Sequence, residues 1–179
     1  TYHACKMIES KIIITDLFVP IVEKTNTRVN AVRPVGDRYD ILYLAASVEE
    51  INATLVKMSN SNTQSGKRYP AILLFQPIKE VANLDSIELP DLRFLIAMNT
   101  LPNLSREERK IQSFIPYLNP IRDAFLHEIS RSTKFRECSV WAIKKEEVDW
   151  PFFSENEQKN LFDEFIDCIE LKIKLNVKR

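Results

Sequence analysis

The chain has 179 residues, of which 45% are hydrophobic and 28% charged, a length and composition typical of one compact domain. Its 25 Lys plus Arg balance 25 Asp plus Glu, which excludes a global electric field that would attract nucleic acid or an acidic membrane. The chain has only two glycines, Gly36 and Gly66, far apart, which excludes the glycine-rich phosphate loops of nucleotide-binding folds.

Cysteine and histidine usage gives no metal or redox motif. Cys5, Cys138 and Cys168 are odd in number and have no metal-like spacing, and the only histidines are His3 and His127. We therefore expect reduced thiols, no metal and no cofactor. The apolar run at residues 12–14 is too short for a signal-peptide core or a membrane span, and with the reduced thiols this points to a reducing cytoplasm.

The first part of the chain predicts a helix followed by a hairpin. Apolar residues over 7–24 fall loosely on one helical face. Residues 29–35 and 39–44 are β-prone and flank a short connection that contains Gly36. Two such runs around a glycine predict two strands of a β-hairpin.

A second helix and a polar loop follow. Ser47 and Glu50 have the spacing of a capping box, in which each side chain binds a free backbone amide at a helix start. The apolar spacing that follows predicts a short helix over 48–58. Residues 59–68 contain no apolar side chain, so we expect a mobile surface loop.

The middle of the chain predicts two central strands. Residues 69–75 and 92–98 are runs of strand length, continuously or almost continuously apolar, as expected for strands covered on both faces. Residues 76–91 carry Pro77 and Pro90, which indicates an extended connection. Its length suits either a wide hairpin or a crossover.

The strongest helix signal lies between residues 105 and 131. A second capping box begins at Ser105, and because Pro116 and Pro120 lack amide donors, we expect a short helical turn there and a separate main helix. The main helix should begin near Asn119, with this residue as its cap, and end near Arg131. Across the whole segment 105–131 the apolar residues recur at three- and four-residue steps: Ile111, Phe114, Ile115, Leu118, Ile121, Phe125 and Ile129.

The last part predicts two further strands. Residues 139–143 suit a brief strand, and residues 169–177 alternate apolar with polar side chains, as in a strand with one buried and one solvated face. Together these elements predict a single α+β domain over residues 1–179. In it, a mostly antiparallel β-sheet packs against one long α-helix and one or two shorter helices.

Two arrangements of residues are candidates for a catalytic site. Glu170 and Lys172 form the Glu-x-Lys element of metal-dependent nucleases, which also needs an aspartate from an adjoining strand. Asp149 and Asp163 precede it, but neither lies in a convincing strand, and an alternating strand produces Glu-x-Lys by default. His127 has no nucleophile at a suitable spacing, which favours a surface histidine. The sequence therefore assigns no catalytic residue.

Two groups of residues are candidates for a subunit or partner interface. The basic strip near the end could face phosphate, or could protect an exposed sheet edge from unwanted pairing. The aromatic loop around Pro151 could fill the core or anchor a partner. These candidates are Trp150, Phe152 and Phe153 in the loop, and Lys172, Lys174, Lys178 and Arg179 in the strip.

Much of the second half resembles a family of viral structural proteins. The resemblance lies in the order of two apolar strands, a capping-box segment, a helix and a last segment: 69–74, 92–97, from Ser105, 115–121 and 162–171. This order is similar to small neck proteins of tailed bacteriophages and prophages, especially those of Bacteroidetes hosts. Within these it resembles the tail-terminator or tail-completion class. Residues 47–68 lie outside the pattern.

The resemblance implies a non-enzymatic virion protein without cofactors. Its copies would form a ring, six-fold by analogy, that caps the tail tube and joins it to the head-side connector proteins. It would be assembled in the bacterial host cytoplasm, without contact with a membrane, and could lie near DNA in the lumen. The alternatives are a metal-dependent nuclease that uses Glu170 and Lys172, and a monomeric adaptor that uses the aromatic loop.

Overall fold

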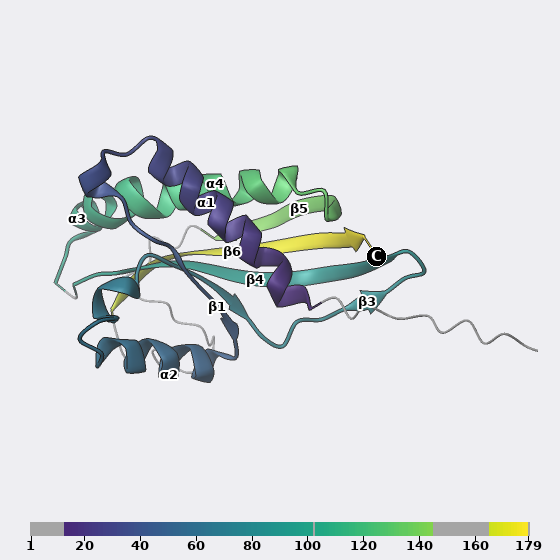
Figure 1. The fold of residues 1–179 in the computed structure, drawn as a ribbon, viewed down its shortest axis with the longest axis horizontal. Helices are drawn as coiled ribbons and strands as arrows, with labels where there is room; N and C mark the ends of the chain where they lie inside the picture. Colours follow the sequence, from purple (N-terminus) through teal and green to yellow (C-terminus); the bar gives the residue numbers. More distant parts are fainter. Residues whose placement is uncertain (1–12, 102, 145–164, 179) are drawn as a thin grey trace, which may run out of the picture.

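The computed structural model describes residues 13–101, 103–144 and 165–178 (Figure 1). They form a mixed α and β structure in which a six-stranded sheet carries helices on both faces. The strands are β1 (Leu42–Ala46), β2 (Ala71–Phe75), β3 (Val81–Ala82), β4 (Ser86–Asn99), β5 (Phe135–Lys144) and β6 (Ile166–Lys178). The α-helices are α1 (Val19–Ala31), α2 (Val48–Ser59), α3 (Arg106–Arg109) and α4 (Asn119–Arg131). Three 3₁₀-helices, η1 (Ile14–Phe18), η2 (Val35–Asp37) and η3 (Ser65–Lys67), and one π-helix, η4 (Lys110–Leu118), complete the set.

The sheet is mixed, with the strand order β1-β2-β4-β6-β5 and the short β3 beside β4. All neighbours are antiparallel except β1 and β2, which are parallel. The predicted mixture of α and β with a mostly antiparallel sheet is thus confirmed, while the one parallel pair was not foreseen. The C-terminal strand β6 lies between β4 and β5 and is therefore an interior strand.

Alternation along β2 divides the core between the two faces of the sheet. Ile72 and Leu74 belong to the larger cluster, which α1, η4 and α4 cover. Ala71, Leu73 and Phe75 belong to the smaller cluster under α2. Because successive side chains of a strand point to opposite faces, α2 lies on the other face from α1 and α4. Every residue of β2 is buried, as the uninterrupted apolar run predicts.

Phe94 of β4 is the centre of the larger cluster. Phe18, at the end of η1, meets its ring edge-on at a centroid distance of 4.9 Å, and Phe125 of α4 does so at 5.1 Å. Edge-on aromatic pairs are stabilised beyond the area that they bury. One buried ring in the sheet therefore positions the start of α1 and the middle of α4.

The hairpin predicted around Gly36 is wrong. Residues 29–31 are the last turn of α1, and residues 35–37 form η2. The β-branched side chains of this stretch favoured a strand, but Val22, Thr25 and Val29 are all buried at helical spacing, and burial of that helical face outweighs β-propensity. The predicted strand over 39–44 begins only at residue 42, and the predicted helix over 7–24 lies partly outside the described residues.

The elements between residues 47 and 99 largely follow the sequence. The capping box of α2 is present: the Glu50 amide donates to the Ser47 hydroxyl at 3.3 Å, and the Ser47 amide donates to the Glu50 carboxylate at 3.1 Å. The polar segment 59–68 includes the short helix η3, and its mobility stays a prediction. The connection over 76–91 is a wide hairpin rather than a crossover, because β2 and β4 are neighbouring antiparallel strands. β4 begins within this connection, at Ser86, and pairs there with β3.

The helical segment from residue 106 to 131 is continuous. Instead of ending the helix, Pro116 lies inside the π-helix η4, which joins α3 to α4. The predicted bounds of the main helix agree with α4. Asn119, predicted as the cap, is instead the first residue of the helix. The side chain of Asn119 accepts a hydrogen bond from Arg122 at 3.1 Å and does not cap the backbone. With 13 residues, α4 is no longer than α1. Among the described residues, no single α-helix therefore stands out as the long one that the sequence predicted.

The last strand is more buried than predicted. Glu170, on the face expected to be solvated, is 8% exposed, and Cys168, which precedes the predicted strand on the same face, is 7% exposed, so the first half of β6 is covered on both faces. Alternation with solvent begins only at Lys172. The predicted strand over 139–143 is part of the longer β5, which pairs with β6 along its length.

We expect Phe94→Ala to lower the free energy of unfolding by about 3–5 kcal/mol, because it leaves a cavity between the sheet and both helices. Urea denaturation followed by circular dichroism measures this loss. Ile13→Ala is the control, since Ile13 is 56% exposed and its removal should change stability by less than about 0.5 kcal/mol. Equal losses for the two variants would contradict the central position of Phe94.

Candidate interaction site

An apolar groove of about 480 Å³ lies between the C-terminal half of α1 and the η4–α4 segment. Two of its lining side chains are strongly exposed, Val32 at 87% and Ile115 at 56%. Exposed large apolar side chains that share one concave surface are typical of protein contact sites. The groove is lined by Arg28, Val29, Val32, Arg33, Ile115, Pro116, Pro120, Asp123, Ala124 and His127.

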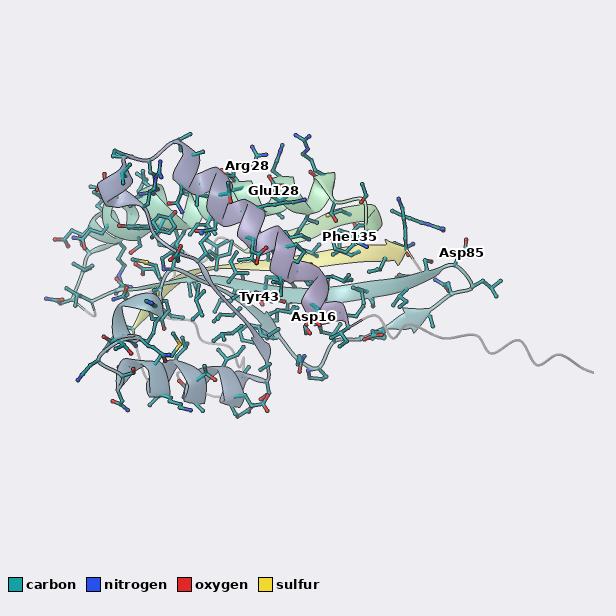
Figure 2. The ribbon with its side chains drawn as sticks, in the orientation of Figure 1. Asp16, Arg28, Tyr43, Asp85, Glu128 and Phe135 are labelled. Atoms are coloured by element: carbon teal, nitrogen blue, oxygen red, sulfur yellow. The ribbon has the colours of Figure 1, made fainter. Side chains whose placement is uncertain are left out.

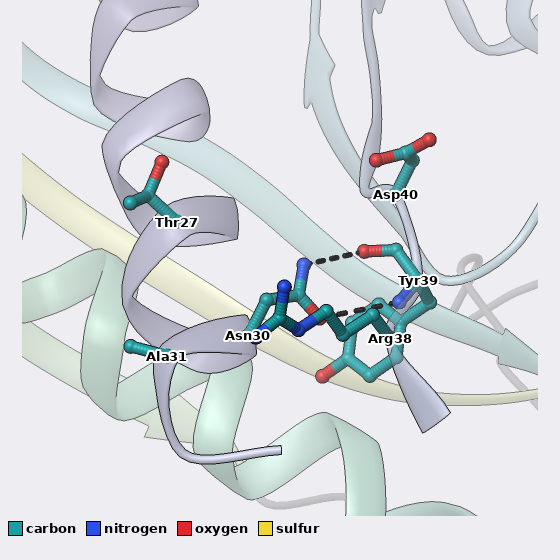
Figure 3. Close-up of a pocket in the computed structure, with 6 residues that line it drawn as sticks. All are labelled: Thr27, Asn30, Ala31, Arg38, Tyr39 and Asp40. Atoms are coloured by element: carbon teal, nitrogen blue, oxygen red, sulfur yellow. Dashed lines mark hydrogen bonds between the residues drawn. The ribbon is translucent and has the colours of Figure 1, made fainter. Parts of the chain in front are cut away.

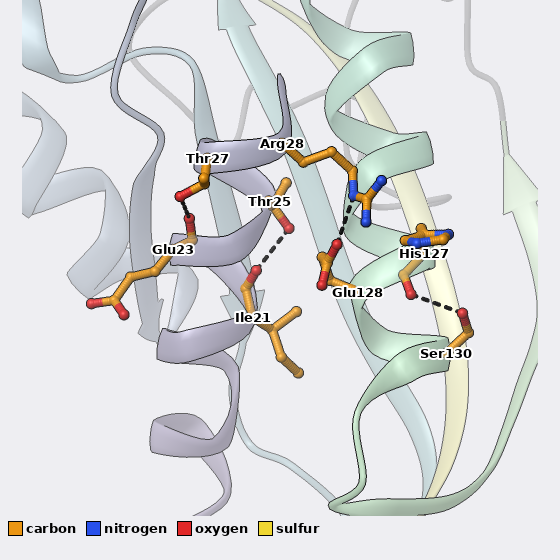
Figure 4. A network of polar contacts seen from close by, with 8 residues as sticks. All are labelled: Ile21, Glu23, Thr25, Thr27, Arg28, His127, Glu128 and Ser130. Carbon is orange, nitrogen blue, oxygen red and sulfur yellow. Dashed lines mark hydrogen bonds and ion pairs between the residues drawn. The ribbon is translucent and has the colours of Figure 1, made fainter. Parts of the chain in front are cut away.

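One ion pair joins the two walls of this groove. The Arg28 guanidinium contacts the Glu128 carboxylate at 2.6 Å, and these residues face each other between α1 and α4 in Figures 2 and 4. Glu128 is mostly covered, at 11% side-chain exposure, whereas Arg28 is 45% exposed. His127 of α4 is exposed beside them, as the sequence predicted for a surface histidine. The rim of the groove thus combines apolar side chains with exposed nitrogen groups.

Arg33 lines the groove and connects it to neighbouring elements. Its guanidinium lies 4.6 Å from the ring centre of Tyr39 and 5.2 Å from that of Tyr117, within the range of cation–π attraction. It also donates a hydrogen bond to the backbone carbonyl of Pro116 in the π-helix. Burial raises the pKa of Tyr39, and the neighbouring Arg33 charge opposes that shift. This one side chain therefore connects α1, the segment before β1, and η4.

A second, more polar cavity of about 500 Å³ lies on the other side of Tyr39 (Figure 3). Its main polar group is the Asn30 amide, which donates to the Tyr39 carbonyl at 2.7 Å and accepts from the Tyr39 amide at 3.2 Å. Asn26 donates to the Asp40 carboxylate at 3.3 Å. Because these groups bind one another, the cavity is best explained as the joint between α1 and the strand that follows.

The lysines of the basic strip predicted near the end of the chain lie on the polar face of β6, whereas Arg179 lies outside the described residues. Lys174 contacts the Glu88 carboxylate at 2.6 Å, Lys172 is half-buried, and Lys178 is exposed. The explanation that these lysines protect an edge strand is wrong, because β6 has a partner on each side. Within the described residues the outer strands of the sheet are β1 and β5.

The Glu-x-Lys pair is not accompanied by the aspartate that a nuclease needs among the described residues. Glu170 is 8% exposed and forms an ion pair with Arg93 of β4. Asp149 and Asp163 lie outside the described residues, and the described part of the chain holds no group of three or more His, Cys, Asp or Glu side chains that could bind a metal. Glu170 thus has a structural partner where the motif would place a metal.

The remaining sequence predictions concern the aromatic loop, the cysteines and membrane-spanning segments. The aromatic residues Trp150, Phe152 and Phe153 lie outside the described residues. Cys138 and Cys168 are free thiols, and burial raises the pKa of the Cys138 thiol. No helix in the described ranges has the length and apolarity to cross a membrane.

Sequence reasoning missed the residues that form the groove. Ile111 and Ile115 continue the apolar spacing of the helix and look like core positions, yet they are 64% and 56% exposed. A π-helix has more residues per turn than an α-helix, so their side chains leave the buried face that Phe114 and Leu118 keep. The only signal was Pro116, which disturbs regular α-helical hydrogen bonding.

Comparisons of the chain with known protein families, with curated proteins and with solved structures found no match.

We expect Arg33→Ala to lower the free energy of unfolding by about 1–3 kcal/mol, since the Pro116 carbonyl loses a charged donor and two rings lose their cation. A double-mutant cycle with Tyr117→Leu should give a coupling energy of about 0.5–1 kcal/mol. Arg38→Ala, an exposed arginine beside the second cavity, is the matched control and should have little effect. Additive losses would show that Arg33 and Tyr117 do not interact.

Proposed function

We propose that the protein is a non-enzymatic structural protein of the bacteriophage neck, whose copies form a ring that caps the tail tube. The ring would join the tube to the head-side connector proteins within the virion, after assembly in the bacterial host cytoplasm. The proposal starts from the resemblance of residues 69–171 to tail-terminator and tail-completion proteins. The observation in the structure that carries it is the apolar groove with its exposed side chains, Val32 and Ile115.

The groove supports an interaction protein more than an enzyme. Its apolar lining offers contact area, while its charged rim residues are engaged with one another, as in the Arg28–Glu128 pair. Residues that act as acid and base in catalysis would need to converge on a space where a substrate fits. Among the groove residues that the structure describes, no such convergence exists, whereas contact with another protein requires only shape and apolar surface.

The edge of the sheet gives further support. β1 has the sequence Leu-Tyr-Leu-Ala-Ala, without a charge or a proline, and within the described residues it pairs only with β2. Exposed edge strands usually carry charges, prolines or bulges that prevent pairing with other chains. An uncharged edge strand fits a subunit that is covered by neighbours in an assembly, where strands can be added across an interface.

We expect the purified protein to form a closed oligomer with a central hole. The proposed ring has six copies of the chain. Light scattering over a range of protein concentrations gives the absolute mass, and negative-stain images of the same sample give the shape. A mass equal to the 20.9 kDa chain at every concentration, together with no binding to isolated tail tubes, would contradict the proposal.

A monomeric adaptor is the second candidate, because the same groove fits a single partner protein as well as a second copy. In that case the aromatic loop would anchor the partner, and Trp150→Ala should abolish capture of that partner without changing the melting temperature. Lys178→Ala, at an exposed position on β6, is the control for an unspecific surface effect. A partner bound equally well by the Trp150 variant would exclude this use of the loop.

A further inference from the structure

The turn between β3 and β4 carries an apolar side chain that is almost fully exposed in the described structure. Leu84 is 97% exposed, at a position in a tight turn where Gly, Asn, Asp and Ser usually occur. The Asn83 amide donates to the Ser86 carbonyl at 2.9 Å, which places Leu84 and Asp85 at the apex of the hairpin. Among the residues that the structure describes, none explains a leucine at this apex.

This apex projects beyond the paired part of the sheet. Ser86, the first residue of β4, stands opposite Lys178, the last described residue of β6, so the turn before Ser86 has no strand beside it. Asp85 marks the apex at one end of the long axis in Figure 2. An ion pair at 3.2 Å between Asp85 and Arg136 of β5 supports the base of the turn. Leu84 is therefore held out from the body on a supported hairpin.

The groove lies away from the hairpin apex. It is formed at the C-terminal end of α1 and along η4 and the first half of α4, whereas the β3–β4 turn is at the far end of the molecule in Figure 1. Leu84 and Val32 are 97% and 87% exposed, so neither is covered by the part of the chain that the structure describes. Two exposed apolar features of one chain that cannot meet each other can meet between two copies.

The two features also match in shape and charge. The apex offers one apolar side chain next to the Asp85 carboxylate, whose side chain is 72% exposed. The groove offers an apolar hollow larger than one leucine side chain, with the half-exposed Arg28 and the exposed His127 on its rim. Arg28 is paired with Glu128, and Asp123 is paired with Arg122 at 2.7 Å. Because the lining itself holds two guanidinium groups, Arg28 and Arg33, and one carboxylate, Asp123, a carboxylate beside the inserted leucine meets a lining with an excess of positive charge.

We propose that the β3–β4 hairpin of each copy inserts Leu84 into the α1–η4–α4 groove of the next copy. Because apex and groove are different surfaces, the contact is head-to-tail, and its repetition closes a ring when the rotation from one copy to the next allows closure. This inference rests on the proposed ring function and specifies the contact between its subunits. The same groove is then filled by a neighbouring copy and not by a different protein.

Disulfide crosslinking tests the contact directly. In a Cys5→Ser, Cys138→Ser background that keeps the wild-type oligomer mass, the double variant Leu84→Cys, Val32→Cys should give a ladder of covalent multimers on oxidation. Each single variant alone should give no ladder, and a mixture of the two single variants should stop at dimers. Crosslinked dimers from Leu84→Cys alone would reveal an apex-to-apex contact and overturn the proposal, as would the absence of a ladder from an intact oligomer.

Light scattering of Leu84→Asp gives an independent measurement. We expect at least about a thirty-fold rise in the concentration at which the oligomer dissociates, the effect of losing one central contact residue. Val19→Asp is the matched control: Val19 is 42% exposed, and an acidic residue at the first position of α1 suits the helix dipole. If Leu84→Asp assembles like the wild type, the hairpin contact is wrong while the ring stands. A wild-type protein that stays monomeric and does not bind isolated tail tubes would contradict both.

Discussion

The aromatic cluster on Phe94 is the constraint on which the rest of the structure depends. Phe18 and Phe125 both meet its ring edge-on, and Phe18 also stacks on Phe135 at the start of β5 at 5.8 Å. These four rings connect η1, the strand β4 in the sheet, the helix α4 and the outer strand β5. Once they are packed, α1 and α4 must cover the same face of the sheet.

The groove follows from how the two helices continue beyond this cluster. α1 and α4 approach each other at the Arg28–Glu128 pair, and the π-helix then carries the chain away from a regular helical path. Arg33 fills the space that results, with its guanidinium between two tyrosine rings and its hydrogen bond to the Pro116 carbonyl. What remains unfilled is the apolar hollow next to Val32. The groove is thus a product of the packing on Phe94 and of the π-helix.

Local signals in the sequence predicted local structure well, and long-range packing explains where they failed. The predictions of the capping box at Ser47 and of the buried strand β2 were correct. The capping box depends only on nearby side chains and backbone amides, and an uninterrupted apolar run directly indicates a strand that is buried on both faces. The end of α1 was predicted as a strand, since the contacts that hold Val29 come from α4 and from residues far away in the chain. The groove was not predictable, because an exposed isoleucine in a π-helix has the same spacing as a buried one in an α-helix.

The charges on the other face of the sheet bear on what a ring of this protein could enclose. The basic strip is not a field of unpaired lysines, because Lys174 is paired with Glu88, and Arg93 beside it is paired with Glu170. The whole chain has a net charge of zero. Binding to DNA depends mainly on cations that neutralise phosphates and release counterions. If this face lined the channel of the proposed ring, such paired charges would let DNA pass without holding it, because they are less available to neutralise phosphates.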